Sequence, residues 1–143
     1  MKKGLFFLVV LFTIINLSLF ASAAVLHKNI PLNNEIESQA SATLTMRETT
    51  LVSGKYSASL SLNVKNLLPE TSHKYQVWLI DDESQYHLNL GMLETSKKGK
   101  GMFKYKTNDI NLQLYDTILI TQEEIMDNDP HPAMHILSGE LPF

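Results

Sequence analysis

The fold class of this chain is decided by the stretch Tyr56-Ser57-Ala58-Ser59-Leu60-Ser61-Leu62-Asn63-Val64. Five apolar side chains alternate here with four small polar ones. A helix would spread the apolar positions around its circumference, whereas a strand places them all on one face. The stretch is therefore predicted to be a β-strand with one buried and one solvated face.

Segments of the same character recur from residue 41 to the end of the chain, separated by turn-forming residues. Together with residues 56–64 they predict about eight short strands, which is typical of an antiparallel, all-β sandwich of the immunoglobulin or fibronectin kind. We therefore expect one β-sandwich domain over residues 41–143. The other predicted strands are Thr43–Met46, Tyr75–Ile80, Tyr86–Leu93, Met102–Thr107, Ile110–Tyr115, Thr117–Gln122 and Met134–Leu141.

The N-terminal region predicts export from the cytoplasm. Two lysines precede an apolar run from Leu5 to Phe20, and the small residues Ala21-Ser22-Ala23 follow it, which is the form of a secretory signal peptide over residues 1–23. The alternative is a retained membrane anchor, because the run approaches the length that spans a bilayer. Contact with a membrane is expected only if the signal stays uncleaved. Residues 24–40 show no sustained period and contain Pro31, which predicts a linker or an N-terminal edge strand near residues 25–30.

Composition narrows the function classes. Cleavage would leave 120 residues with a formal charge of −5, so neither nucleic acid nor an anionic membrane is an expected partner. The chain has no cysteine, which excludes disulfides, thiol catalysis and a lipid-modified cysteine. Neither a Gly-x-Ser-x-Gly motif nor a glycine-rich phosphate loop is present, and we expect neither enzymatic activity nor a cofactor.

The segment 127–135, DNDPHPAMH, contains the strongest candidates for a metal site. Asp127, Asp129, His131 and His135 are ligand types found in exported copper and zinc proteins, and Met134 could join them. Two prolines disfavour a helix here, and in an extended segment the two histidine Cα atoms would lie about 13 Å apart. An ordinary proline-rich loop is therefore the competing interpretation. A calcium loop is excluded, because His131 and Pro132 occupy positions that would need an acidic or amide residue and a glycine.

Two charged runs also suggest sites, and each has a simpler interpretation. Asp81-Asp82-Glu83 could bind a cation or supply an acid–base pair, but a solvated turn between strands is expected. Phe103 and Tyr105 are interleaved with lysines, as in some nucleic-acid surfaces. Strand alternation places these rings on the face opposite Lys104 and Lys106, which predicts rings in the core and an edge strand protected by charge. The full set of lysines in this run is Lys97, Lys98, Lys100, Lys104 and Lys106.

Several motifs taken in order resemble the extracytoplasmic C-terminal domain of anti-sigma-K factors. They are LLPETSHKYQVWLID at residues 67–81, Leu90-Gly91, Gly101-x-Phe103, YDTILITQE at residues 115–123 and ILSGEL at residues 136–141. The resemblance covers roughly residues 43–141 and implies a fibronectin-like β-sandwich. It also implies structural roles for these residues.

Three such roles can be stated. Tyr75 looks like the tyrosine of a tyrosine corner, whose ring lies in the core and whose hydroxyl bonds the backbone upstream. Trp78 is expected to fill the core between the sheets. Gly139 is expected to mark a bulge or a close backbone approach in the last strand.

The resemblance stops at the N-terminus. A complete anti-sigma factor carries a sigma-binding region ahead of its membrane helix, and only Met1-Lys2-Lys3-Gly4 precedes the apolar run here. Regulation of transcription is therefore not expected. The sequence predicts a secreted or cell-envelope binding module whose partner is an envelope or extracellular protein or a small ligand. The alternative is an exported metal-binding protein that uses the segment 127–135.

Overall fold

This computed structural model of the chain describes residues 25–34, 39–50, 56–68, 73–126 and 131–143, without the side chains of residues 25–29 and 48–50. The predicted signal peptide, residues 1–23, lies outside this part of the chain. Within the described ranges, no helix has the length and apolar character needed to cross a membrane.

The described chain is built from antiparallel strands, which confirms the predicted all-β class. Eight strands form one sheet in the order β5-β4-β7-β8-β1-β2-β3-β6, and one short 3-10 helix, η1, interrupts them. The elements are β1 (Val25–Asn34), β2 (Ser41–Thr50), β3 (Tyr56–Lys65), β4 (His73–Asp81), β5 (Tyr86–Leu93), β6 (Gly101–Thr107), η1 (Leu112–Leu114), β7 (Thr117–Glu124) and β8 (Met134–Glu140).

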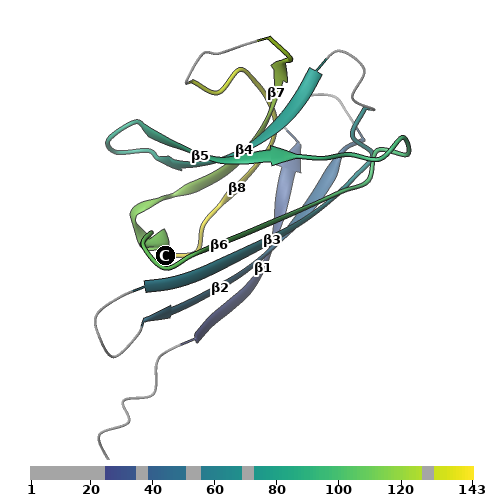
Figure 1. Cartoon of the computed structure of the whole chain (residues 1–143). Coiled ribbons are helices and arrows are strands. Elements are labelled where there is room, and N and C mark those ends of the chain that lie inside the picture. Colours follow the sequence, from purple (N-terminus) through teal and green to yellow (C-terminus); the bar gives the residue numbers. More distant parts are fainter. Residues whose placement is uncertain (1–24, 35–38, 51–55, 69–72, 127–130) are drawn as a thin grey trace, which may run out of the picture.

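The sheet folds back on itself until its two outer strands approach each other (Figure 1). We call β1-β2-β3-β6 half A and β5-β4-β7-β8 half B. The halves are joined where Asn33 and Asn34 at the end of β1 pair with β8. They approach again on the far side, where Thr95 beyond β5 bridges to Gly101 at the start of β6. The sheet is therefore nearly closed, like a barrel.

The main core lies between the two halves. Half A contributes alternate residues of β2 and β3, and half B contributes alternate residues of β4 and β7. Because the period is two, the intervening residues of β3 point outward, and the predicted burial of its apolar face is confirmed. Core side chains with essentially no exposed surface include Leu44, Met46, Leu62, Val77, Leu79, Leu93, Ile118, Ile120 and Leu137.

The N-terminal strand is longer than the sequence pattern predicted. Residues 24–40 were expected to be a linker or a short edge strand, yet β1 pairs with β2 from Val25 to Leu32 and then with β8. Ile30 and Leu32 are buried on either side of the exposed Pro31, so the period of two continues through the proline. Proline is tolerated because, among the described residues, β2 is the only strand that pairs with β1 at this position.

The predicted strand at Ile110–Tyr115 is wrong. The segment forms η1, and the Asn111 side chain caps this helix by accepting a hydrogen bond from the Gln113 N–H at 3.1 Å. Leu112 is fully buried while Leu114 is 63 % exposed, so the apolar alternation is not a strand face. An asparagine that caps a single turn overrides the weak strand pattern.

The predicted role of Tyr75 is confirmed. Its ring is buried in the main core, and its hydroxyl donates to the Leu68 carbonyl at 3.1 Å. This bond connects β4 to the chain that leads into it. Gly139 was expected at a bulge or a close backbone approach, but it pairs in register with Ile118, and the atom close to it belongs to a side chain: a Cβ there would meet Leu32 Cγ at 3.2 Å.

Replacing Tyr75 with Phe should lower the free energy of unfolding by about 1 kcal/mol, because the ring stays buried while the hydrogen bond is lost. Urea unfolding followed by circular dichroism measures the change. Tyr86→Phe is the control, since Tyr86 is 56 % exposed. An equal loss in the two variants would contradict a specific role for the Tyr75 hydroxyl.

Candidate functional site

A second apolar cluster lies on the outer face of half B. It consists of Trp78 and Ile80 from β4 with Leu119 from β7, all at most 8 % exposed. Trp78 was expected between the sheets, and this expectation is wrong. Val77 and Leu79 face the main core, so alternation turns Trp78 and Ile80 outward.

A chain of hydrogen bonds connects this cluster to the segment before β8. The Trp78 Nε1–H donates to Thr121 Oγ1 at 2.9 Å, and the Thr121 hydroxyl donates to Glu123 Oε1. Glu123 Oε1 also accepts the Ala133 N–H at 3.1 Å. Glu123 is 3 % exposed, and a carboxylate this buried requires such donors to offset its lost hydration.

A cavity of about 580 Å³ opens beside the cluster, on the same face. Ile80 and Leu119 give it apolar walls, and Gln85 and Asp82 come from the turn after β4. The segment that leads into β8 contributes its opposite side. The remaining lining residues are His87, Thr117, His131, Pro132, His135 and Ser138.

The structure brings three histidines to this cavity. His131 and His135 come from the segment singled out in the sequence, and His87 comes from β5. The rings of His87 and His131 meet edge to face, with centroids 5.9 Å apart and planes at 89°. Sequence reasoning missed His87. This residue reaches the cavity because its strand, β5, pairs with β4, and β4 in turn pairs with β7.

The other predicted metal ligands are not brought to the cavity. Asp127 and Asp129 lie outside the described residues, and Met134 is 58 % exposed without lining it. Across the parts of the chain that the structure describes, no group of three or more His, Asp or Glu side chains is arranged to hold a metal ion.

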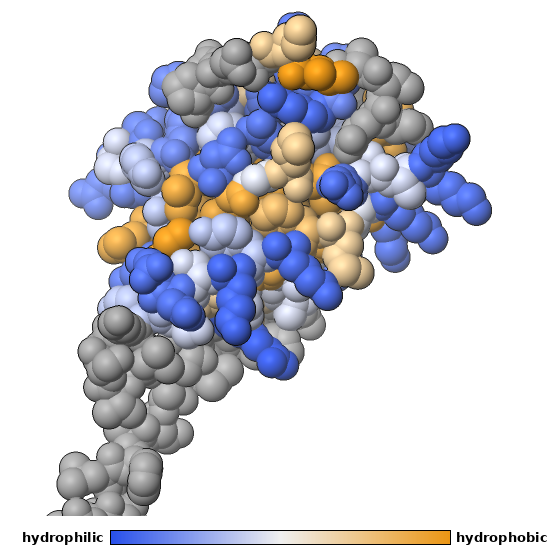
Figure 2. Space-filling model, viewed as in Figure 1, coloured by the Kyte–Doolittle hydropathy of each residue, from blue (hydrophilic) through white to orange (hydrophobic). Residues whose placement is uncertain are grey.

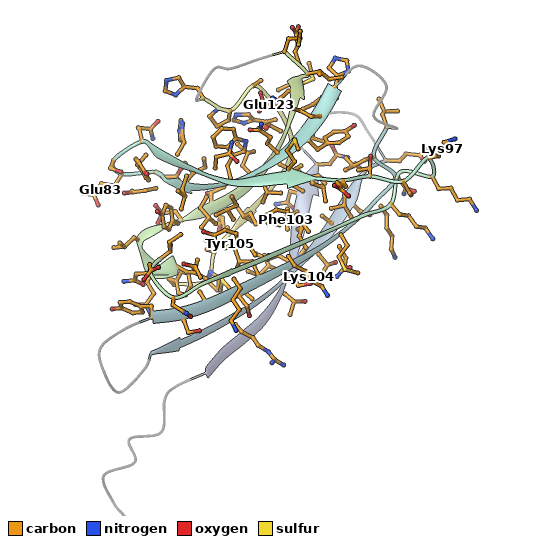
Figure 3. The ribbon with its side chains drawn as sticks, in the orientation of Figure 1. Glu83, Lys97, Phe103, Lys104, Tyr105 and Glu123 are labelled. Atoms are coloured by element: carbon orange, nitrogen blue, oxygen red, sulfur yellow. The ribbon has the colours of Figure 1, made fainter. Side chains whose placement is uncertain are left out.

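The acidic run forms the predicted turn between β4 and β5, with Glu83 at its tip (Figure 3). Asp81 accepts hydrogen bonds from the Ser84 hydroxyl at 2.5 Å and from the Ser84 N–H at 3.1 Å. These bonds hold the pKa of Asp81 below its ordinary value. Asp82 and Glu83 are exposed and line a hollow with Asp116 and Glu140.

The lysine run is divided as predicted. Lys97, Lys98 and Lys100 are exposed in the turn between β5 and β6, and Figure 3 shows Lys97 at its tip. Phe103 and Tyr105 point between the two halves, whereas Lys104 lies on the opposite face of β6 (Figure 3). The rings therefore serve the core, not a stacking surface for bases.

Comparisons with known proteins give no relative. No protein-family model matches the chain, and neither a curated protein nor a solved structure matches it.

Replacing Thr121 with Val should lower the free energy of unfolding by about 1–3 kcal/mol, because the buried Trp78 N–H and Glu123 carboxylate both lose a partner. Urea unfolding followed by circular dichroism measures this loss. The matched control is Thr43→Val at an exposed position of β2, where a change within about 0.5 kcal/mol is expected. Equal losses would show that the network does not stabilise this face.

The Asp81 turn predicts a pH dependence. A folded-state pKa below the unfolded value stabilises the fold at neutral pH, and this contribution is lost as pH falls through the folded pKa. Carbon-13 NMR titration of the Asp81 carboxyl group should show the lowered pKa, and Ser84→Ala should raise it. Ser57→Ala, on half A, should leave it unchanged. An Asp81 pKa that does not respond to Ser84→Ala would contradict the assigned cause.

Proposed function

We propose that this chain is an exported, non-enzymatic binding module that recognises a small ligand in the cavity on the outer face of half B. The main observation that supports this proposal is the cavity itself. Its volume of about 580 Å³ falls within the range of small-molecule sites. Its lining combines the apolar residues Ile80, Leu119 and Pro132 with a larger number of polar side chains that can orient a ligand.

The lining residues indicate the chemistry of the ligand. Ile80 and Leu119 favour an apolar body at the walls, while the three imidazoles, Gln85 and Thr117 offer hydrogen bonds around it. Asp82 adds an acceptor, although its Oδ2 already receives the Thr117 hydroxyl at 3.2 Å. The ligand class is thus a compact molecule with one apolar side and a polar or weakly basic edge.

The arrangement of acids supports binding over catalysis. Glu123 is the one buried carboxylate within the described ranges, and it is occupied by the Thr121 hydroxyl and the Ala133 N–H. Asp82, Asp116 and Glu140 are exposed, so burial does not prepare them as general acids.

The proposal also includes a more specific fold than the all-β class. We assign an immunoglobulin- or fibronectin-like β-sandwich similar to the extracytoplasmic domain of anti-sigma-K factors. The order β5-β4-β7-β8 in half B and the Tyr75 hydroxyl bond are consistent with it. Secretion to the cell envelope or beyond rests on the signal-like residues 1–23.

Screening a library of small organic fragments against the full chain by NMR tests the ligand site. Hits should shift resonances of His87, Leu119 and the single tryptophan, Trp78. Thr117→Phe should fill the cavity and abolish these shifts. Thr107→Phe, at another half-buried threonine, should preserve them. Fragments that bind only elsewhere, or equally well to Thr117→Phe, would refute the proposal.

The second candidate function is metal binding, which the contact between His87 and His131 favours. His87 and His131 are the neighbouring pair, and a metal would require His135 to move toward them, because the three histidines are not arranged as a metal site. The other candidate ligands, Asp127 and Asp129, lie outside the described residues. Two neighbouring imidazoles suit Cu(II) or Zn(II) better than Ca(II), which prefers oxygen ligands.

Thermal unfolding and Trp78 fluorescence of the full chain with Cu(II), Zn(II) and Ca(II) decide between the two functions. A metal that binds only the folded state stabilises it by about 2.7 kcal/mol at a hundredfold excess over Kd. The double variant His131→Ala/His135→Ala should abolish that shift, whereas His73→Ala at the start of β4 should retain it. A shift that survives in the double variant, or none in the wild type, would eliminate the metal function.

A further inference from the structure

The outer face of half A carries an ordered array of cations and hydroxyls. In one row Arg47 of β2 lies opposite Ser59 of β3, which lies opposite Lys106 of β6. In the next row Thr45 lies opposite Ser61, and Ser61 lies opposite Lys104. Neighbouring strands are about 4.8 Å apart, so the Cα atoms of Arg47 and Lys106 lie on either side of Ser59, separated by about 10 Å.

These residues line a groove of about 490 Å³. Its lining contains Arg47, Lys104 and Lys106 and no acidic residue. Long basic side chains lay their aliphatic stems along the walls and keep their charged ends free in water. Hydrophilic side chains gather below the apolar band of this view, along β6 and β3 (Figure 2).

The local charge contrasts with that of the whole chain. The formal net charge is −3, yet three positive charges cluster here and the acidic residues of the β4–β5 turn lie in half B. Because the Debye length is about 8 Å at physiological salt, distant acids are largely screened from this face. An anionic group in the groove is therefore attracted by the three cations and can accept hydrogen bonds from Ser59, Ser61 or Thr45.

The lining also discriminates among polyanions. Single-stranded nucleic acid requires aromatic side chains on which its bases stack. Tyr105 is the one aromatic residue of the groove, and its half-buried ring packs against the core. Hydroxyls and aliphatic stems instead match the hydroxyl groups and C–H faces of sugars.

We propose that the outer face of half A binds an anionic linear polysaccharide through its carboxylate, phosphate or sulfate groups. The negative groups lie between Arg47 and the two lysines, and the serine and threonine hydroxyls contact the sugar backbone. This site is separate from the cavity on half B, and it does not depend on the function proposed for that cavity.

Calorimetric titration of the full chain with polygalacturonate, dextran sulfate and neutral dextran tests the proposal. At least one of the two anionic polymers should bind, with an affinity that falls at least tenfold between 50 and 300 mM salt, about the sensitivity of multi-charge contacts. Neutral dextran should not bind. Failure of both anionic polymers, or equal binding of neutral dextran, would overturn the proposal.

A charge-matched pair of variants locates the site. Arg47→Gln/Lys104→Gln/Lys106→Gln should weaken binding at least tenfold. Lys97→Gln/Lys98→Gln/Lys100→Gln removes the same charge from the β5–β6 turn and should weaken it less than threefold. Should the first triple variant fail to fold, Lys104→Gln and Lys106→Gln are measured singly, each with an expected loss of about threefold. Equal losses of affinity in the two triple variants would show a general charge effect and refute the groove as the binding site.

Two further polyanions test the identity of the partner. Single-stranded oligothymidylate and phosphatidylglycerol vesicles present phosphates without a sugar polymer that fits the groove. Both should bind at least tenfold more weakly than the better anionic polysaccharide. Tighter binding of the oligonucleotide or of the vesicles would replace the polysaccharide with a nucleic acid or a membrane surface.

Discussion

Burial of β4 on both of its faces is the constraint on which the rest of this protein depends. Tyr75, Val77 and Leu79 join the core shared by the two halves, while Trp78 and Ile80 require cover on the opposite side. A strand apolar on both faces cannot leave one of them in water without losing much of its hydrophobic stabilisation, at about 25 cal/mol per Å². The segment that leads into β8 meets part of this requirement, and the cavity lies beside it.

The need to cover Trp78 explains the polar network beneath it. The indole must place its N–H against an acceptor, and Thr121 supplies one from the neighbouring strand. The Thr121 hydroxyl in turn donates a hydrogen bond to Glu123 Oε1, which also accepts one from the Ala133 N–H. A buried carboxylate thus holds Ala133, which lies between His131 and His135, the two histidines that this segment brings to the cavity. The apolar cluster and the histidine site are consequences of one arrangement.

Sequence patterns predicted much of the fold, and their failures have identifiable causes. The period of two revealed β3 because one of its faces is polar. For β4 the same reasoning could not say which face is internal, since both are apolar, and Trp78 was assigned to the wrong side. The full length of β1 was not predicted because proline usually interrupts a strand, although Ile30 and Leu32 on either side of Pro31 are both buried and continue the alternation.

The candidate site was only half predictable, for a related reason. His131 and His135 are close in sequence and were identified together. His87 joins them through the pairing of β4 with β5 and with β7, which no local pattern encodes. The same holds for the cationic groove, where Arg47 and Lys106 come together only because each pairs with Ser59 of β3. Pairing of distant strands creates both surfaces.

The groove of half A and the cavity of half B differ in whether their residues can be substituted without affecting the stability of the fold. The groove of half A lies over strands whose inner faces fill the main core, so its outward residues can change without altering that core. The cavity of half B has walls that belong to a buried cluster, so changes there alter both binding and stability. Because the outer faces of the halves point away from their common core, a small ligand and a polysaccharide would not compete for space. Any coupling between them would have to pass through the close-packed core, where side chains have little room to move.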